Sequence, residues 1–188
     1  GFANISYDAK GVRLAFDNCP VNIVLNPLAE EFDLPYDKSG DLGRKGKVDE
    51  TLLKKINALS YYHQQPPKSL GREWIEADFL PILNETNLNT QDKMRTIYEH
   101  IAVQITKDLS DKGKMLVTGG GAFNSFLIER MQELTITEIV LPEPDLINYK
   151  EAIVFAFMGV LRLREQVNCL ASVTGARKDS CVGVIFLP

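Results

Sequence analysis

A short apolar segment, three successive glycines and an amphipathic helix constrain the fold of this chain more than any other feature. Residues 115–118 have the apolar character of a buried strand, and the glycines follow them directly. Residues 124–134 then predict a helix, and residues 138–141 predict another strand. Strands that alternate with helices in this way indicate an α/β domain.

The first residues predict a β-hairpin. Its strands are expected at residues 4–8 and 12–17, with a turn at residues 9–11. Apolar and more polar residues alternate along the return strand, which is the period expected of a half-buried strand.

The clearest helix is expected at residues 90–109, where Met94, Ile97 and Ile101 share one face and Thr90 would be the N-cap. The other expected elements are helices at residues 22–32, 50–59, 72–83 and 148–165, a kink or restart at Pro27, an exposed loop at 37–47 and a last strand at 182–187. Within residues 148–165 the most apolar stretch predicts a buried helix. Its residues Ala152, Phe155, Ala156 and Gly159 would let it pack closely against a sheet.

Composition excludes several classes of protein. Of the 188 residues, 45% are hydrophobic and 24% are charged, as in an ordinary soluble domain. No apolar run approaches the roughly 20 residues that span a bilayer, so no membrane segment is expected. The net charge of -4 and the scattered Lys and Arg residues argue against a nucleic-acid partner.

The cysteine and histidine residues predict neither a disulfide framework nor a metal site. Cys19, Cys169 and Cys181 are odd in number and form no CxxC pair. His63 and His100 are too far apart in sequence to suggest metal ligands. A reducing cytoplasm is the expected location.

Asp17 is the first candidate for chemistry. It follows an expected strand and precedes a Pro-containing turn and a helix start, which would present its carboxylate at a sheet edge where α/β folds bind ligands. A carboxylate there can accept a proton from water or a hydroxyl. The alternative, which spacing alone favours, is that Asp17 caps the following turn. Cys19 beside it has no nearby base, so we do not expect a nucleophile.

Gly119, Gly120 and Gly121 are the second candidate. Glycines between a strand and a helix allow a ligand to approach the backbone, and the helix N-terminus favours an anion or a polar ligand. A tight turn also requires glycine, and the sequence is neither a P-loop nor a GxGxxG fingerprint. Nucleotide contact and a plain turn are equally compatible with these residues.

Glu151 is a candidate for a second carboxylate in the cleft. Asn148 and Glu151 also have the spacing of a capping box, which would be a purely structural role. Lys68 and Arg72, in the segment PPKSLGRE, could meet a phosphate or a carboxylate, although solvated loop charges are the simpler interpretation.

The order of these motifs resembles the anhydro-N-acetylmuramic acid kinase family over essentially all 188 residues. The matching motifs are GFANIS, FDNCPVN, PPKSLGRE, VTGGGAFN, YKEAIVFAF and VTGA. The resemblance implies the actin-like ATPase architecture, in which two RNase H-like lobes clasp ATP. Residues 1–188 would be the single C-terminal lobe, without the N-terminal lobe and its Gly-rich phosphate loop.

The resemblance also implies roles for individual residues. Asp17 would be the general base that activates water toward the anomeric carbon of 1,6-anhydro-N-acetylmuramic acid, and the freed O6 would take the γ-phosphoryl group of ATP. The remaining implied roles are sugar contact for Glu151 and Asn22, adenosine contact for Gly119, Gly120 and Gly121, and a place near the phosphates for Asn4. The segment PPKSLGRE receives no role. ATP and Mg²⁺ are the implied cofactors, and a homodimer is implied.

The chain also departs from the family pattern. The family motif FDTGPGN is FDNCPVN here, because Asn18, Cys19 and Val21 replace Thr, Gly and Gly. Without a phosphate loop, we expect this chain alone to be a poor kinase, since phosphoryl transfer depends on positioning and charge stabilisation. The alternatives are another sugar or acyl kinase of the same architecture, or a non-catalytic module that binds nucleotide or a partner lobe.

Overall fold

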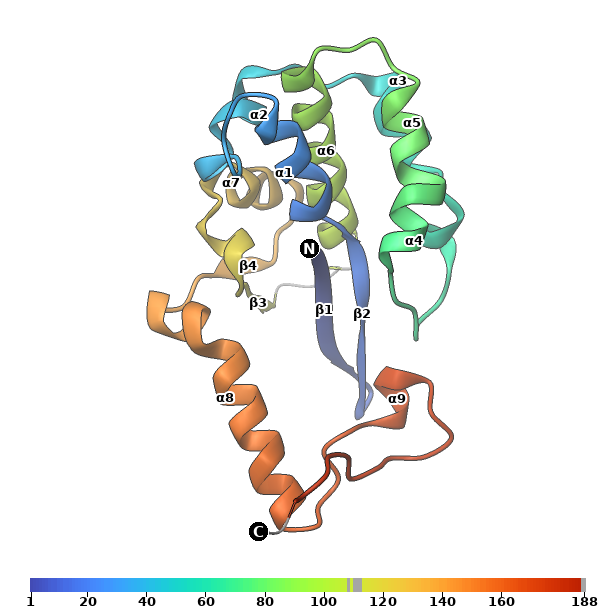
Figure 1. Cartoon of the computed structure of the whole chain (residues 1–188), viewed down its shortest axis with the longest axis vertical. Coiled ribbons are helices and arrows are strands. Elements are labelled where there is room, and N and C mark those ends of the chain that lie inside the picture. The colour runs from blue at the N-terminus through green and yellow to red at the C-terminus, as the bar shows by residue number, and fades with distance from the viewer. Residues whose placement is uncertain (108, 110–112, 187–188) are drawn as a thin grey trace.

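Helix α6 (Thr90–Thr106) is the centre of the computed structural model, which describes residues 1–107, 109 and 113–186. Its Met94, Ile97, Tyr98 and Ile101 are fully buried, as their spacing on one face predicts. Five elements pack around it: α1 (Asn22–Glu30), α2 (Asp41–Lys45), α3 (Glu50–Asn57), α7 (Ser125–Leu134) and strand β2 (Val12–Pro20) (Figure 1). The apolar face of α6 therefore organises the hydrophobic core.

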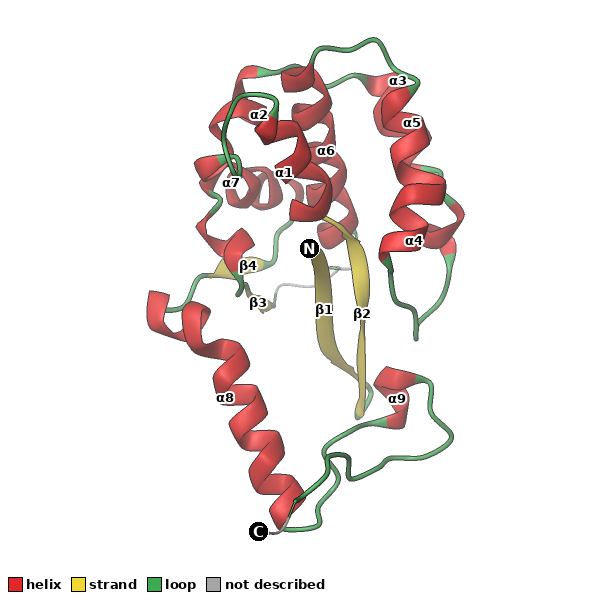
Figure 2. Ribbon diagram, viewed as in Figure 1, coloured by secondary structure: helices red, strands yellow, loops and turns green. Residues whose placement is uncertain are grey.

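The predicted hairpin is present and longer than expected. Strand β1 (Phe2–Ala9) pairs antiparallel with β2, and the pair extends away from α6 and the helices around it (Figure 2). Gly11 closes the turn with a positive φ of 82°, and its amide donates to Asp8 Oδ1 at 2.8 Å. The turn residues thus have the backbone conformation that a tight hairpin requires.

The predicted strand–helix–strand unit is also present. Strand β3 (Lys114–Leu116) runs parallel to β4 (Glu138–Val140), and the short helix η4 (Gly120–Phe123) and α7 connect them. In the described residues the four strands form two separate two-stranded sheets. The mixed α/β class is confirmed.

The other predicted helices are found with shifted boundaries. Helix α1 continues past Pro27, and residues 72–84 form α4 (Arg72–Trp74), η3 (Ile75–Phe79) and α5 (Leu80–Asn84). A short helix that was not predicted, η2 (Ser60–His63), precedes them. The N-cap of α6 is Asn89 and not Thr90, because Asn89 Oδ1 accepts from the Asp92 amide at 2.9 Å.

The prediction of an exposed loop at residues 37–47 is wrong. These residues form η1 (Lys38–Gly40) and α2, and the carboxylate of Asp37 is the reason. It accepts hydrogen bonds from the amides of Leu42 at 2.8 Å and Gly43 at 3.0 Å, which are unsatisfied donors of the first turn. Composition identified the segment as polar, but it did not reveal that the Asp37 carboxylate caps a helix that begins at Asp41.

The predictions for the C-terminal part are partly wrong. Helix α8 (Pro144–Leu163) begins earlier than expected and is largely exposed, with Phe155 at 69% and Phe157 at 62%. Helix α8 contacts η4, and its far end, which extends away from α6 in Figure 1, is held by the C-terminal segment, because Arg162 Nε donates to the Gly183 carbonyl at 2.9 Å. Residues 182–186 form no strand; residue 187 lies outside the described residues. The short α9 (Ala171–Thr174) lies against β2.

None of the helices within the described ranges is both long and apolar enough for a membrane span.

Candidate functional site

A cleft of about 1100 Å³ separates β1 from the β3–η4 turn and α8. The segments that line it include the first strand, the start of α1, the glycine turn and the first half of α8, together with parts of β2, β3, α6 and α7. It brings together six residues that the sequence predicted to bind ligands: Asn4, Asn22, Gly119, Gly120, Gly121 and Glu151. A cleft of this size accommodates a substrate and part of a nucleotide.

Only one of the three glycines has a backbone conformation that favours glycine. Gly119 has a φ of 79°, a conformation that favours glycine. A Cβ at Gly120 or Gly121 would meet no atom within 4 Å, and neither residue has a positive φ. Neither packing nor backbone strain therefore explains these two glycines, while a bare backbone beside a cleft leaves room for a ligand.

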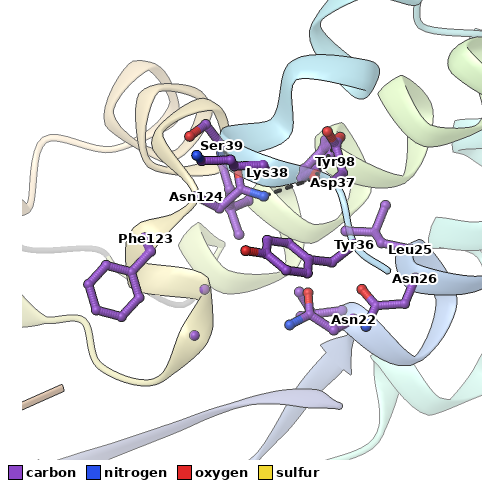
Figure 3. Close-up of a pocket in the computed structure, with 14 residues that line it drawn as sticks. Asn22, Leu25, Asn26, Tyr36, Asp37, Lys38, Ser39, Tyr98, Phe123 and Asn124 are labelled. Carbon is purple, nitrogen blue, oxygen red and sulfur yellow. Dashed lines mark hydrogen bonds between the residues drawn. The ribbon is translucent and has the colours of Figure 1, made fainter. Parts of the chain in front are cut away.

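A smaller pocket of about 180 Å³ adjoins the glycine turn (Figure 3). Asn22, Gly120 and Gly121 line both cavities, so the pocket and the cleft share a wall. The Tyr36 ring lies in the middle of the pocket in Figure 3. The pocket thus extends the cleft toward the side of α6.

A buried hydrogen-bond network fixes the wall of this pocket. The Tyr98 hydroxyl donates to Asp37 Oδ2 at 3.1 Å and accepts from Asn124 Nδ2 at 2.8 Å. Asn124 is also the N-cap of α7, because its Oδ1 accepts from the Leu127 amide at 3.0 Å. Burial raises the pKa of Tyr98, and the Asp37 carboxylate raises it further, so the hydroxyl keeps its proton. The network links the start of α2 to the glycine turn through α6.

Asp17 lines neither of these two cavities, but it lies one strand away from the larger one. In the hairpin register it is the direct partner of Asn4. Directly opposite residues in an antiparallel pair have Cβ atoms about 4.5–5.5 Å apart. Asp17 is part of β2, which continues to Pro20, so the predicted turn directly after it is absent.

The carboxylate of Asp17 is held by the segment that received no role from the sequence. Its Oδ2 accepts from the Leu70 amide at 2.8 Å, and its own amide donates to the Lys68 carbonyl at 3.4 Å. The Tyr61 hydroxyl donates to the Asp17 carbonyl at 2.7 Å. Outside the hairpin, these hydrogen bonds of Asp17 run to residues 61–70, and none of them caps the following turn.

Lys68 brings a positive charge to the same region. Its ammonium lies 5.3 Å from the centre of the Phe16 ring and 4.7 Å from that of Tyr61, and it donates to the Tyr61 carbonyl at 3.2 Å. Sequence reasoning missed this role of PPKSLGRE. The signal was a charged segment stiffened by two prolines, which does not by itself reveal a partner so distant in sequence.

The structure also gives the positions of Glu151 and Cys19. The capping-box interpretation of Asn148 and Glu151 is wrong, because α8 begins at Pro144 and its N-cap is Glu143. Glu151 is exposed and lines the cleft. Cys19 is fully buried, and burial raises the pKa of its thiol, so it remains a protonated core residue.

Comparison with known proteins agrees with the resemblance of the motifs. The family model described as anhydro-N-acetylmuramic acid kinase matches residues 1–188. A protein of that name from Sulfurovum sp. (strain NBC37-1) is 35% identical over 193 residues, covering 100% of this chain and 53% of the relative. Its namesake from Vibrio vulnificus (strain CMCP6) is 31% identical over 198 residues, with 99% and 53% covered. The chain spans about half the length of the curated relatives that it matches, and it belongs to the anhydro-N-acetylmuramic acid kinase family.

Proposed function

We propose that residues 1–188 are the C-terminal, RNase H-like lobe of an ATP-dependent kinase that acts in peptidoglycan recycling. The full protein would convert 1,6-anhydro-N-acetylmuramic acid and water to N-acetylmuramic acid 6-phosphate, with ADP as the second product. The observation that carries the proposal is the cleft, which gathers Asn4, Asn22, Gly119–Gly121 and Glu151 from four segments of the chain. Membership of the kinase family supplies the reaction.

In this proposal ATP lies along the glycine turn. The open space beside Gly120 and Gly121 supports this placement, because a nucleotide could contact the backbone there directly. The described residues contain no group of three metal-ligating side chains. Mg²⁺ is commonly held by one or two carboxylates together with substrate phosphates, so we propose that the ion accompanies ATP.

Asp17 would act as the general base. It would take a proton from water as the water oxygen bonds to the anomeric carbon of the sugar. The bond between that carbon and O6 then breaks, and O6 attacks the γ-phosphorus of ATP as the bond to ADP breaks. The hydrogen bond from Leu70 to Oδ2 supports this role, because it fixes the carboxylate and leaves Oδ1 for the proton.

The part of the relatives that this chain does not span would bind the phosphates and close the cleft. The apolar face of α8 supports such a contact, since Ile153, Phe157 and Val160 lie on one side of the helix and are 52%, 62% and 49% exposed. Exposed apolar patches of this kind mark interaction sites. Homodimer formation remains a further prediction of the resemblance.

The decisive experiment measures ADP release by the full-length protein with 1,6-anhydro-N-acetylmuramic acid. Common hexoses and an Asp17→Asn variant are assayed in parallel. We expect turnover with the anhydro sugar alone and its loss in the variant. Turnover only with another sugar would indicate a different kinase of this fold. Absence of ADP release with every substrate would favour a non-catalytic binding module.

A further inference from the structure

Asn18 is the extra residue of a β-bulge beside Asp17. In the hairpin register Ala3 pairs with Cys19 and Asn4 pairs with Asp17, so Asn18 is inserted between two paired positions. Bulges are frequent next to active sites, where they redirect a side chain. The Asn18 side chain is only 3% exposed, and the residue lines the large cleft.

Only one of the two polar atoms of the Asn18 side-chain amide has a hydrogen-bond partner among the described residues. Its Nδ2 donates to the Gln104 carbonyl at 3.4 Å, while Oδ1 is buried and has no hydrogen-bond donor among the described residues. Exchanging the two amide atoms would place the oxygen against the Gln104 carbonyl, so this carbonyl fixes the orientation. A buried acceptor without a donor destabilises the fold, and such atoms in native proteins call for a specific explanation.

We propose that Asn18 Oδ1 accepts a hydrogen bond from a hydroxyl or amide N–H of the ligand in the cleft, and so determines sugar specificity. The identity of that sugar rests on the proposed function. The neighbouring groups favour a ligand rich in hydrogen-bond donors, because both are carboxylates, which accept hydrogen bonds. Asp17 directly precedes Asn18 in β2, and Glu151 lies on the other wall of the cleft. Ionised phosphates offer only acceptors, so this end of the cleft suits the sugar, and the glycine turn suits the nucleotide.

The test compares two variants of the full-length protein. Asn18→Leu has a similar size and removes the acceptor, whereas Asn18→Thr keeps an acceptor and introduces the residue of the related motif. Calorimetry would measure binding of 1,6-anhydro-N-acetylmuramic acid, N-acetylglucosamine, glucose and ATP without turnover. Thermal unfolding would be measured on the same samples.

We expect the Leu variant to unfold at the same temperature as the natural protein or higher, because the buried acceptor is gone. Its affinity for the sugar should fall about tenfold or more, while its affinity for ATP stays within about twofold, as expected when one ligand loses a hydrogen bond. The Thr variant should retain most of the sugar affinity.

Asn57→Leu is the matched control. Asn57 Oδ1 accepts from Gln104 Nε2 at 2.8 Å and lies 2.6 Å from His100 Nδ1, so its loss should lower stability without changing sugar affinity. Unchanged sugar affinity in Asn18→Leu would overturn the inference and indicate a bridging water instead. The inference would also fail if the natural protein bound no sugar in the panel. Sugar binding without any ADP release would overturn the proposed function but leave this inference intact.

Discussion

The main-chain amide of Leu70 donates a 2.8 Å hydrogen bond to Oδ2 of Asp17, a residue 53 positions earlier in the chain. Leu70 belongs to an extended segment that makes a second hydrogen bond with Asp17. In that bond the Asp17 amide donates to the Lys68 carbonyl. The strand that carries Asp17 and the segment that follows two prolines are therefore one structural unit. If Asp17 is the base, this unit sets the direction of its carboxylate.

Replacing Leu70 with proline should reduce turnover, because proline has no amide hydrogen to donate to Asp17. A hydrogen bond to a charged group contributes about 1.5–3 kcal/mol, so kcat of the full-length protein should fall about 10- to 100-fold with little change in KM. Leu70→Ala is the control, since it keeps the amide. Steady-state kinetics with equal kcat for the two variants would show that this hydrogen bond does not position the base.

Replacing Tyr98 with phenylalanine should destabilise the fold. The hydroxyl joins Asp37 to Asn124, and its removal leaves Asn124 Nδ2 without its acceptor. A loss of about 1–3 kcal/mol corresponds to a decrease in Tm of about 3–10 °C for a chain of this size. Tyr36→Phe is the control from the same pocket, because Tyr36 is 54% exposed, and it should change stability little. Similar melting temperatures for both variants would contradict the role assigned to the network.

The sequence predicted the elements whose evidence is local. The 3.6-residue period of α6, the alternation in β2 and the glycines after β3 each reflect neighbours within one element, and all three elements are present. The contact between Asp17 and Leu70 could not be predicted, because no local pattern connects the two residues. The exposure of α8 was missed for a related reason. An apolar face predicts that a helix is covered, but not whether its partner lies in the same chain.

Stability should decrease in mild acid because of His100. This side chain is fully buried between Asn57 and Tyr62, and burial lowers its pKa to about 3, with a smaller contribution from Lys107. The unfolded chain, with the ordinary value of 6.5, binds a proton that the folded chain does not bind between these two pH values. The free energy of unfolding should therefore fall below about pH 6.5, by at most about 1.4 kcal/mol per pH unit from this group.

Denaturant unfolding between about pH 5 and 7.5 would measure this dependence in the natural protein, in His100→Gln and in His63→Gln, where the exposed His63 is the control. The pH slope should be smaller in His100→Gln and unchanged in His63→Gln. Equal slopes in all three proteins would show that His100 does not cause the decrease.

Replacing Gly120 with alanine should separate ligand binding from stability. A Cβ at this position meets no atom within 4 Å, and its φ is not positive, so the fold should tolerate the change. If ATP lies against this backbone, the added methyl group would occupy the space of the nucleotide, and its affinity should fall about tenfold or more, or about 1.4 kcal/mol. Gly159→Ala in α8 is the matched control, because its Cβ also enters open space but lines neither cavity.

Calorimetric titration with ATP and thermal unfolding would be measured for both variants. Equal ATP affinities would place the nucleotide away from the glycine turn, and a large loss of stability in Gly120→Ala would show that the fold itself requires this glycine.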